Sequence, residues 1–158
     1  MKKRNRILCI IVFVLLLLLL IAGIVFAWLS RTDYPDAVTE ADGVYMEWIE
    51  EPNRELLSYQ ICNTSENPVY GDNYQLEYKF LGRWYRLMYR AGATYTLEGI
   101  VVGEYADVLK LEENPMQPYA FLPSGKYRLV QRFYTVKDYM LYENRDKYIA
   151  LYLEFELD

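Results

Sequence analysis

The sequence contains no histidine and only two cysteines. Histidine is the commonest general base and metal ligand in proteins, so its absence removes the simplest routes to acid–base catalysis and to zinc binding. Cys9 lies in a long apolar run and Cys62 in the region that follows it, so the two are not expected to pair. A disulfide framework and a cysteine-rich zinc site are therefore excluded, and no cofactor is expected.

Positive charge is scarce outside the N-terminus. The 158 residues include 17 Lys and Arg against 22 Asp and Glu, for a formal net charge of −5. Lys2, Lys3, Arg4 and Arg6 precede the apolar run, which leaves 13 basic against 22 acidic residues, or −9, for the rest of the chain. So acidic a body has no electrostatic reason to bind nucleic acid and gains nothing from anionic lipid headgroups.

Residues 7–29 contain no charged side chain and consist mainly of Leu, Ile, Val and Phe. A helix of about 20 such residues crosses the hydrocarbon core of a bilayer. The basic residues within 1–6 favour a cytoplasmic N-terminus, and Trp28 stands where an indole prefers the far interface. The sequence predicts a signal anchor that spans the cell membrane once, with the C-terminal region outside the cytoplasm.

A cleaved signal peptide is the alternative for this segment, with Val25-Phe26-Ala27 as the cleavage site. The apolar part of a signal peptide is ordinarily about 7–15 residues long, which is shorter than this run. A retained anchor is therefore favoured, although the residues leave cleavage open. Residues 30–42 are polar, with Pro35 and four acids, and predict a short spacer between the membrane and a folded domain.

The domain over residues 43–158 has the pattern of β-strands. Apolar and polar residues alternate over 74–80, and a loop at 81–83 leads into a second strand over 84–89, which predicts a hairpin. Further strands are expected at 43–49, 56–63, 105–111, 126–136 and 149–157, with a charged hairpin loop over 137–147. About seven strands in this length match a two-sheet sandwich, although alternation alone does not distinguish a sandwich from a barrel.

One motif narrows the choice of fold. Leu122-Pro123-Ser124-Gly125-Lys126-Tyr127 places Tyr127 just inside a strand, after a turn at Gly125. This pattern is typical of a tyrosine corner, in which the hydroxyl bonds back to the preceding connection of a Greek-key sandwich. Antibody domains have a cysteine two residues later, where this chain has Leu129, and the partner strand offers Ile61 or Cys62. Apolar packing is expected to replace the disulfide.

The chain resembles a family of bacterial immunoglobulin-like domains on surface proteins and lipoproteins of Gram-positive bacteria. The likeness covers roughly residues 43–158, and the pieces that carry it are Asn63-Thr64-Ser65-Glu66-Asn67, Tyr70-Gly71-Asp72, Gly82-Arg83-Trp84-Tyr85, Leu122-Pro123-Ser124-Gly125-Lys126-Tyr127-Arg128 and the closing apolar strand. Residues 114–119 are inserted relative to the family pattern, and no lipobox is present. The resemblance implies an immunoglobulin-like fold and a surface location, and it brings no established activity or catalytic residues.

No arrangement of residues predicts catalysis or metal binding. Ser124 and Lys126 are too close in sequence to act as nucleophile and base. The adjacent pair Glu112-Glu113 would point to opposite faces of a strand, so adjacency does not supply two carboxylates flanking one bond. Asp72 and Asn73 lack the spacing of a calcium loop, and an Asx turn is the simpler interpretation.

Aromatic side chains are the remaining candidates for function, because 17 of the residues are Tyr. Trp84, Tyr85 and Tyr89 lie on or near one predicted hairpin and could form a contact surface. We expect an all-β, immunoglobulin-like sandwich behind one transmembrane helix, acting without catalysis as an interaction module for another envelope protein. A carbohydrate-binding module that recognises cell-wall glycans through exposed Trp and Tyr is the alternative.

Overall fold

The structure is a computed structural model that describes residues 2–93, 99–103, 107–135 and 147–158, with only the backbone given for residues 2–8 and 27–30. The side chains of the predicted membrane-flanking residues Lys2, Lys3, Arg4, Arg6 and Trp28 therefore lie outside the description, as does most of the loop predicted over 137–147.

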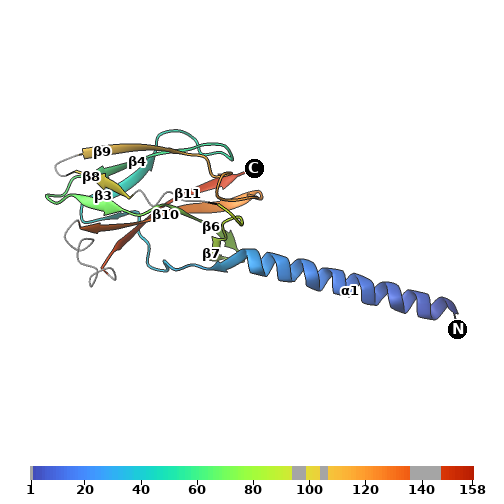
Figure 1. Ribbon diagram of the computed structural model, residues 1–158. Coiled ribbons are helices and arrows are strands. Elements are labelled where there is room, and N and C mark those ends of the chain that lie inside the picture. The colour runs from blue at the N-terminus through green and yellow to red at the C-terminus, as the bar shows by residue number, and fades with distance from the viewer. Residues whose placement is uncertain (1, 94–98, 104–106, 136–146) are drawn as a thin grey trace.

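One apolar helix, α1 (Lys2–Trp28), stands clear of the rest of the chain (Figure 1). The 18 residues Cys9–Phe26 have a mean hydropathy of 3.5, and none of them is buried against the domain. The helix is long and apolar enough to cross a membrane, but a signal sequence near the N-terminus has the same length and composition. The apolar surface of Cys9–Phe26 is thus not covered by any described residue of the domain.

The remaining elements are strands in two antiparallel sheets. The large sheet has seven strands: β1 (Leu29–Arg31), β5 (Val69–Gly71), β6 (Gln75–Phe80), β7 (Arg83–Leu87), β8 (Ile100–Val102), β10 (Gly125–Thr135) and β11 (Ile149–Leu157). The small sheet has four: β2 (Glu40–Ala41), β3 (Val44–Trp48), β4 (Leu57–Asn63) and β9 (Asp107–Glu113). The two sheets enclose one core.

The connections between the sheets are those of an immunoglobulin-like sandwich. Strands β4 and β9 pair in the small sheet although four strands separate them in the chain, and β6 pairs with β10 in the large sheet across a similar gap. Two hairpins, β6–β7 and β10–β11, complete the large sheet around these crossings. The Greek-key arrangement confirms the expected fold class, an all-β immunoglobulin-like sandwich that follows one apolar helix.

The seven predicted strands lie close to observed ones, and four short strands were not predicted. The strand expected at 149–157 has those same bounds, whereas the strand expected at 105–111 begins two residues later and ends at Glu113. Strands β5 and β8 were not predicted, because three residues are too few to establish an alternating pattern. Strands β1 and β2 lie in or beside the predicted spacer.

Residues 29–41 form a strap across the outer face of the large sheet, which corrects the expectation of a spacer over 30–42. The strap begins as β1, paired with β7 at one side of the sheet. It reaches β11 on the other side, where Val38 forms a parallel bridge with Leu151, and it ends as β2, paired with β3. Its polar residues predicted solvent exposure, but several of them bond to the sheet beneath.

The core lies between the inner faces of the two sheets. Ile61 of β4 and Leu129 of β10 are both fully buried there, at the positions where antibody domains carry the disulfide. Cys62 is also buried, but its thiol lies 3.9 Å from the Glu47 carboxylate and it is not part of the central apolar cluster. Of the two alternatives for the partner strand, Ile61 therefore provides the apolar packing.

Candidate functional site

The motif around Tyr127 has the geometry of a tyrosine corner. The Tyr127 hydroxyl donates a short hydrogen bond to the carbonyl oxygen of Pro123, four residues earlier. Burial raises the pKa of Tyr127, so the hydroxyl keeps its proton as a donor. Gly125 has φ 141°, and a Cβ there would come within 2.8 Å of the Tyr78 ring. Both residues therefore support the fold.

The three candidate aromatic side chains leave β7 and the residues after it in different directions. Trp84 lies on the outer face of the large sheet, and its ring is covered by the Arg128 guanidinium at 4.8 Å and the Lys79 ammonium at 4.9 Å. Tyr85 packs against the core from the opposite face of β7. Tyr89 follows β7, with its ring 5.1 Å from that of Tyr119. These residues do not form the row of exposed rings that glycan stacking requires.

The outer face of the large sheet contains a buried ion pair instead. Arg128 is 4% exposed and Glu77 is fully buried, with 2.7 Å between a guanidinium nitrogen of Arg128 and the carboxylate of Glu77. The strap completes the cluster, because the Thr32 hydroxyl donates to the Glu77 carboxylate at 2.5 Å and Arg128 donates to the carbonyl oxygen of Tyr34 at 3.0 Å. A buried charge pair persists only when its remaining donors and acceptors are satisfied in this way.

A second arginine on β10 has a similar environment. Arg132 pairs with Asp72, and its guanidinium lies within 6.0 Å of the rings of Tyr34, Tyr134 and Tyr148. Burial raises the pKa of Tyr134 to about 12, with a further contribution from the Asp72 carboxylate. Burial likewise raises the pKa of Tyr34, which belongs to the strap. The two arginines thus hold the strap on the sheet, and the pairing of β1 with β7 places the end of α1 beside that strand.

The sequence pattern did not predict this arginine–aromatic arrangement. Arg128 and Arg132 alternate with inward-facing residues on β10, so both lie on the outer face of the large sheet. Nothing in that pattern indicates that the face is covered, because the covering residues lie about 95 positions earlier in the chain. The available signal was two arginines on the same face of the longest strand, in a chain rich in tyrosine.

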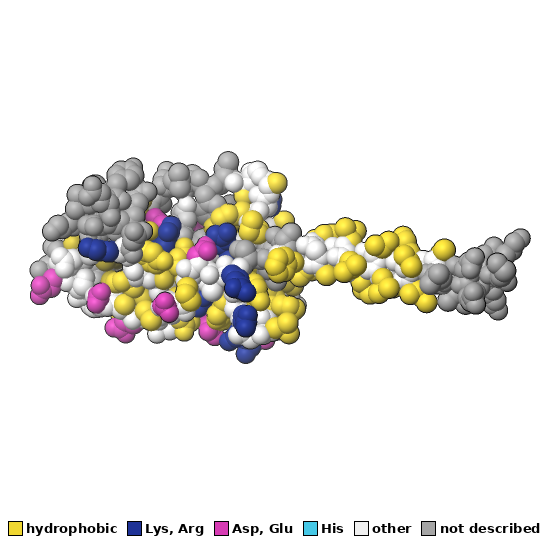
Figure 2. All heavy atoms as spheres, turned by 90° about the horizontal axis from the view of Figure 1, so that it is seen from below, with side chains coloured by type: hydrophobic (Ala, Val, Ile, Leu, Met, Phe, Trp, Pro, Cys, Tyr) yellow, Lys and Arg dark blue, Asp and Glu magenta, His cyan; other side chains and the backbone are white. Residues whose placement is uncertain are grey.

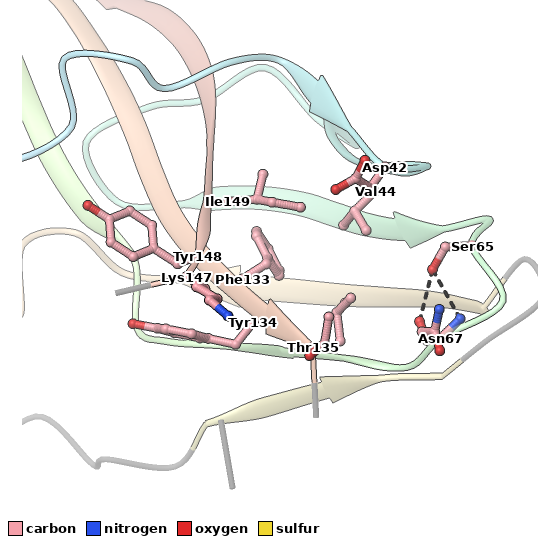
Figure 3. Close-up of a pocket in the computed structure, with 11 residues that line it drawn as sticks. Asp42, Val44, Ser65, Asn67, Phe133, Tyr134, Thr135, Lys147, Tyr148 and Ile149 are labelled. Atoms are coloured by element: carbon pink, nitrogen blue, oxygen red, sulfur yellow. Dashed lines mark hydrogen bonds between the residues drawn. The ribbon is translucent and has the colours of Figure 1, made fainter. Parts of the chain in front are cut away.

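A pocket of about 410 Å³ opens between the sheets where β10 ends and β11 begins (Figure 3). We call it the distal pocket, because it lies at the end of the sandwich opposite the C-terminus, whereas α1 leaves near the C-terminal end (Figure 1). Its apolar wall consists of Val44, Val69, Phe133 and Ile149. Polar and aromatic side chains surround that wall, among them Asp42, Ser65, Asn67, Tyr134, Lys147 and Tyr148.

Two further pockets differ in charge. The first, of about 370 Å³, lies under the start of the strap and is lined by Arg31, Thr32, Pro35, Arg83, Trp84, Tyr85 and Arg128. We call it the proximal pocket. The second, of about 480 Å³, lies beside the C-terminus, and half of its lining residues are acids: Glu51, Glu55, Glu156 and Asp158, together with Pro52, Asn53, Arg54 and Leu157.

Within the described residues, no group of three or more Asp, Glu or Cys side chains is arranged to hold a metal ion. Asp72, the best local calcium candidate in the sequence, is engaged by Arg132 and by the Tyr134 hydroxyl. Burial raises the pKa of Glu113, whereas its neighbour Glu112 is exposed. The two carboxylates therefore have different environments and do not face one another across a cleft.

Comparison with known proteins gives only distant structural likeness. No family model matches the sequence, and no curated protein matches it. The ASH/PapD-like domain 7 of human CEP192 is 12% identical, with 81% of this chain and 91% of that chain covered and a TM-score of 0.33. The Pseudomonas fluorescens alkylpurine DNA glycosylase AlkC, solved with DNA, is 16% identical, with 74% of this chain and 31% of that chain covered and a TM-score of 0.34. Neither likeness carries a functional argument.

Proposed function

We propose that the chain is a membrane-anchored module whose sandwich lies outside the cytoplasm and binds another protein of the cell envelope without catalysing a reaction. The observation that carries this proposal is α1, whose apolar side chains from Cys9 to Phe26 are all exposed. Apolar surface of this extent is stable in lipid and unstable in water. The basic residues before α1 support a cytoplasmic N-terminus, and the resemblance to surface-located bacterial immunoglobulin-like domains supports the outer location of the sandwich.

The strap supports a fixed position of the sandwich relative to the anchor. The strap pairs with β7 of the large sheet from Leu29, the residue that directly follows α1, and Thr32 then bonds to Glu77 of the same sheet. A flexible linker would let the domain sample many orientations. Here the same end of the sandwich stays near α1, and the opposite end stays available to a partner.

The distal pocket is the surface that we assign to that partner. Its apolar wall would receive an apolar side chain of the partner, and the surrounding polar groups would fix its orientation. Lys147 and Asp42 both border the pocket, so neither sign of charge dominates. This suits a protein segment with mixed polar and apolar residues better than a highly charged ligand.

Protease protection tests the topology. The full chain carries a C-terminal epitope, and protease is added to intact cells and to opened cells. We expect digestion of the sandwich in both, together with retention of the chain in the membrane pellet after alkaline carbonate extraction. Digestion only after the cells are opened would reverse the orientation, and a mature mass shortened by the N-terminal residues would establish a cleaved signal peptide instead.

Site-specific crosslinking tests the partner surface. A photocrosslinking amino acid replaces Lys147 at the distal pocket or, as the matched control, Lys110, which is exposed on the outer face of the small sheet. We expect a discrete protein adduct from position 147 in intact cells and none from position 110. Adducts of equal yield from both positions would contradict the pocket assignment. Strong retention of the full chain on peptidoglycan would favour the carbohydrate-binding alternative.

A further inference from the structure

We propose that the proximal pocket binds the phosphate group of an anionic phospholipid in the leaflet from which α1 emerges. The inference deepens the proposed function and rests on α1 being a membrane anchor. It assigns a specific ligand class to a pocket whose lining includes three arginines and a tryptophan.

Two strands bring the key residues together next to the membrane helix. Strand β1 starts directly after α1 and places Arg31 opposite Tyr85 of β7, while Arg83 begins β7 itself. Three strand residues extend about 10 Å, which is the scale of the polar layer outside the hydrocarbon core. A pocket lined by Arg31 is thus within reach of lipid headgroups when α1 spans the bilayer.

The arginines of this region differ in whether they are neutralised. Arg128 pairs with Glu77, and Arg86 pairs with Asp33 of the strap at 2.6 Å. Arg31 and Arg83 are exposed and form no ion pair with any residue in the described part of the chain. The pocket therefore has uncompensated positive charge, which attracts an anion.

The chemistry of these side chains fits a phosphate. A guanidinium presents donors in a planar fork that matches two phosphate oxygens, and two arginines can engage one group from different sides. Trp84 adds an indole, the side chain preferred at membrane interfaces. Lys79 lies 4.9 Å from the centre of that ring and contributes a further positive charge at the border of the site.

The surface distribution of charge agrees with this location. Figure 2 shows the outer face of the large sheet, with most dark blue Lys and Arg side chains gathered on the part of the sandwich nearest to α1 and most of the magenta acids farther away. The net charge of the domain hides this separation, so the proposal departs from the expectation that the acidic domain gains nothing from anionic lipid headgroups. The acidic pocket beside the C-terminus would repel phosphate, so the proximal pocket is the favoured anion site among the three described.

The test uses the full chain reconstituted in nanodiscs of phosphatidylcholine mixed with phosphatidylglycerol. Native mass spectrometry after release from the nanodisc measures how much of each lipid stays bound. We expect the parent chain to retain phosphatidylglycerol preferentially. In the Arg31→Gln/Arg83→Gln variant, the affinity for phosphatidylglycerol should fall about fivefold for each arginine removed. Both side chains are exposed, so the variant should unfold at the same temperature as the parent chain.

The control is Lys110→Gln/Lys147→Gln, which has the same net charge and alters two exposed residues outside the proximal pocket. The basic residues before α1 are unchanged in both variants, so any lipid they hold cancels in the comparison. Equal retention by the two variants would overturn the proposal. Displacement of the lipid by an equal concentration of inorganic phosphate would overturn its assignment to a lipid. Nanodiscs offer the same lipids on both sides, so this result does not depend on the topology that protease protection tests.

Discussion

The outer faces of the two sheets differ in whether their charged side chains are exposed to water. On the small sheet, Glu47 and Lys110 project into water, and the Gln60 side chain donates to the Glu47 carboxylate. This is the ordinary state of an antiparallel sheet with one wet face. On the large sheet, Glu77 and Arg128 occupy equivalent outward positions but are removed from water by the strap.

The comparison shows how one covering segment changes the energetic role of a charge. An exposed charge on the small sheet keeps its hydration and contributes little to stability. A covered charge on the large sheet has lost its hydration and depends on its partner, so removal of the partner leaves an uncompensated buried ion. The strap therefore couples the segment next to the membrane helix to the stability of the sandwich.

The largest expected effect comes from breaking the covered pair. Arg128→Met leaves the Glu77 carboxylate buried without its partner and should lower the free energy of unfolding by about 3–5 kcal/mol. Urea unfolding of the full chain in detergent micelles, followed by near-UV circular dichroism, measures the change. The matched change on the wet face, Lys110→Met, should stay within about 0.5 kcal/mol.

A double variant sharpens the same comparison. Glu77→Leu/Arg128→Met removes both charges and should recover most of the stability, because two apolar side chains need no partner. If Arg128→Met lowered the free energy of unfolding no more than Lys110→Met does, covering the charges with the strap would not affect stability.

A smaller loss of stability is expected when a tyrosine hydroxyl is removed from the inner face of the large sheet than when the covered ion pair is broken. Tyr127→Phe removes the hydroxyl that bonds to Pro123 and should cost about 1–2 kcal/mol. The control, Tyr152→Phe, alters a half-buried residue of the outer face and should cost under about 0.5 kcal/mol. Thermal unfolding of the two variants side by side measures the difference, and equal melting temperatures would argue against a tyrosine corner that stabilises the fold.

The smallest effect concerns alkaline pH and the tyrosines next to Arg132. The pKa of Tyr134 is raised to about 12 from 10.0, so between these values the unfolded chain loses the proton and the folded chain keeps it. This contribution to stability is complete below pH 10 and is lost as the pH rises through about 12. The urea midpoint should therefore fall less steeply above pH 10 in Tyr134→Phe than in the parent chain. An unchanged slope would mean that Tyr134 titrates alike in both states.

Local sequence patterns were sufficient to predict much of the fold. Alternation located β6 and β11 to within a residue, and the turn before Tyr127 indicated how the sheets connect. The strap was missed because its pattern is that of a loop, and its strands have only two or three residues. The same limit applied to the candidate site, where Trp84 was rightly placed on a hairpin but its cover by Arg128 was not foreseeable.

The order of residues alone determined that this protein has one long apolar helix and an acidic, strand-built domain, because helix and strand periods are properties of neighbouring residues. Only the tertiary structure decided which charges are covered, which are paired and which remain available. Glu77 and Arg128 are 51 residues apart in the chain, and Thr32 and Arg128 are 96 apart. Contacts at such separations depend on how the sheets pack and where the strap crosses them, and this placement leaves Arg31 and Arg83, near the end of α1, without an ion pair to any described residue.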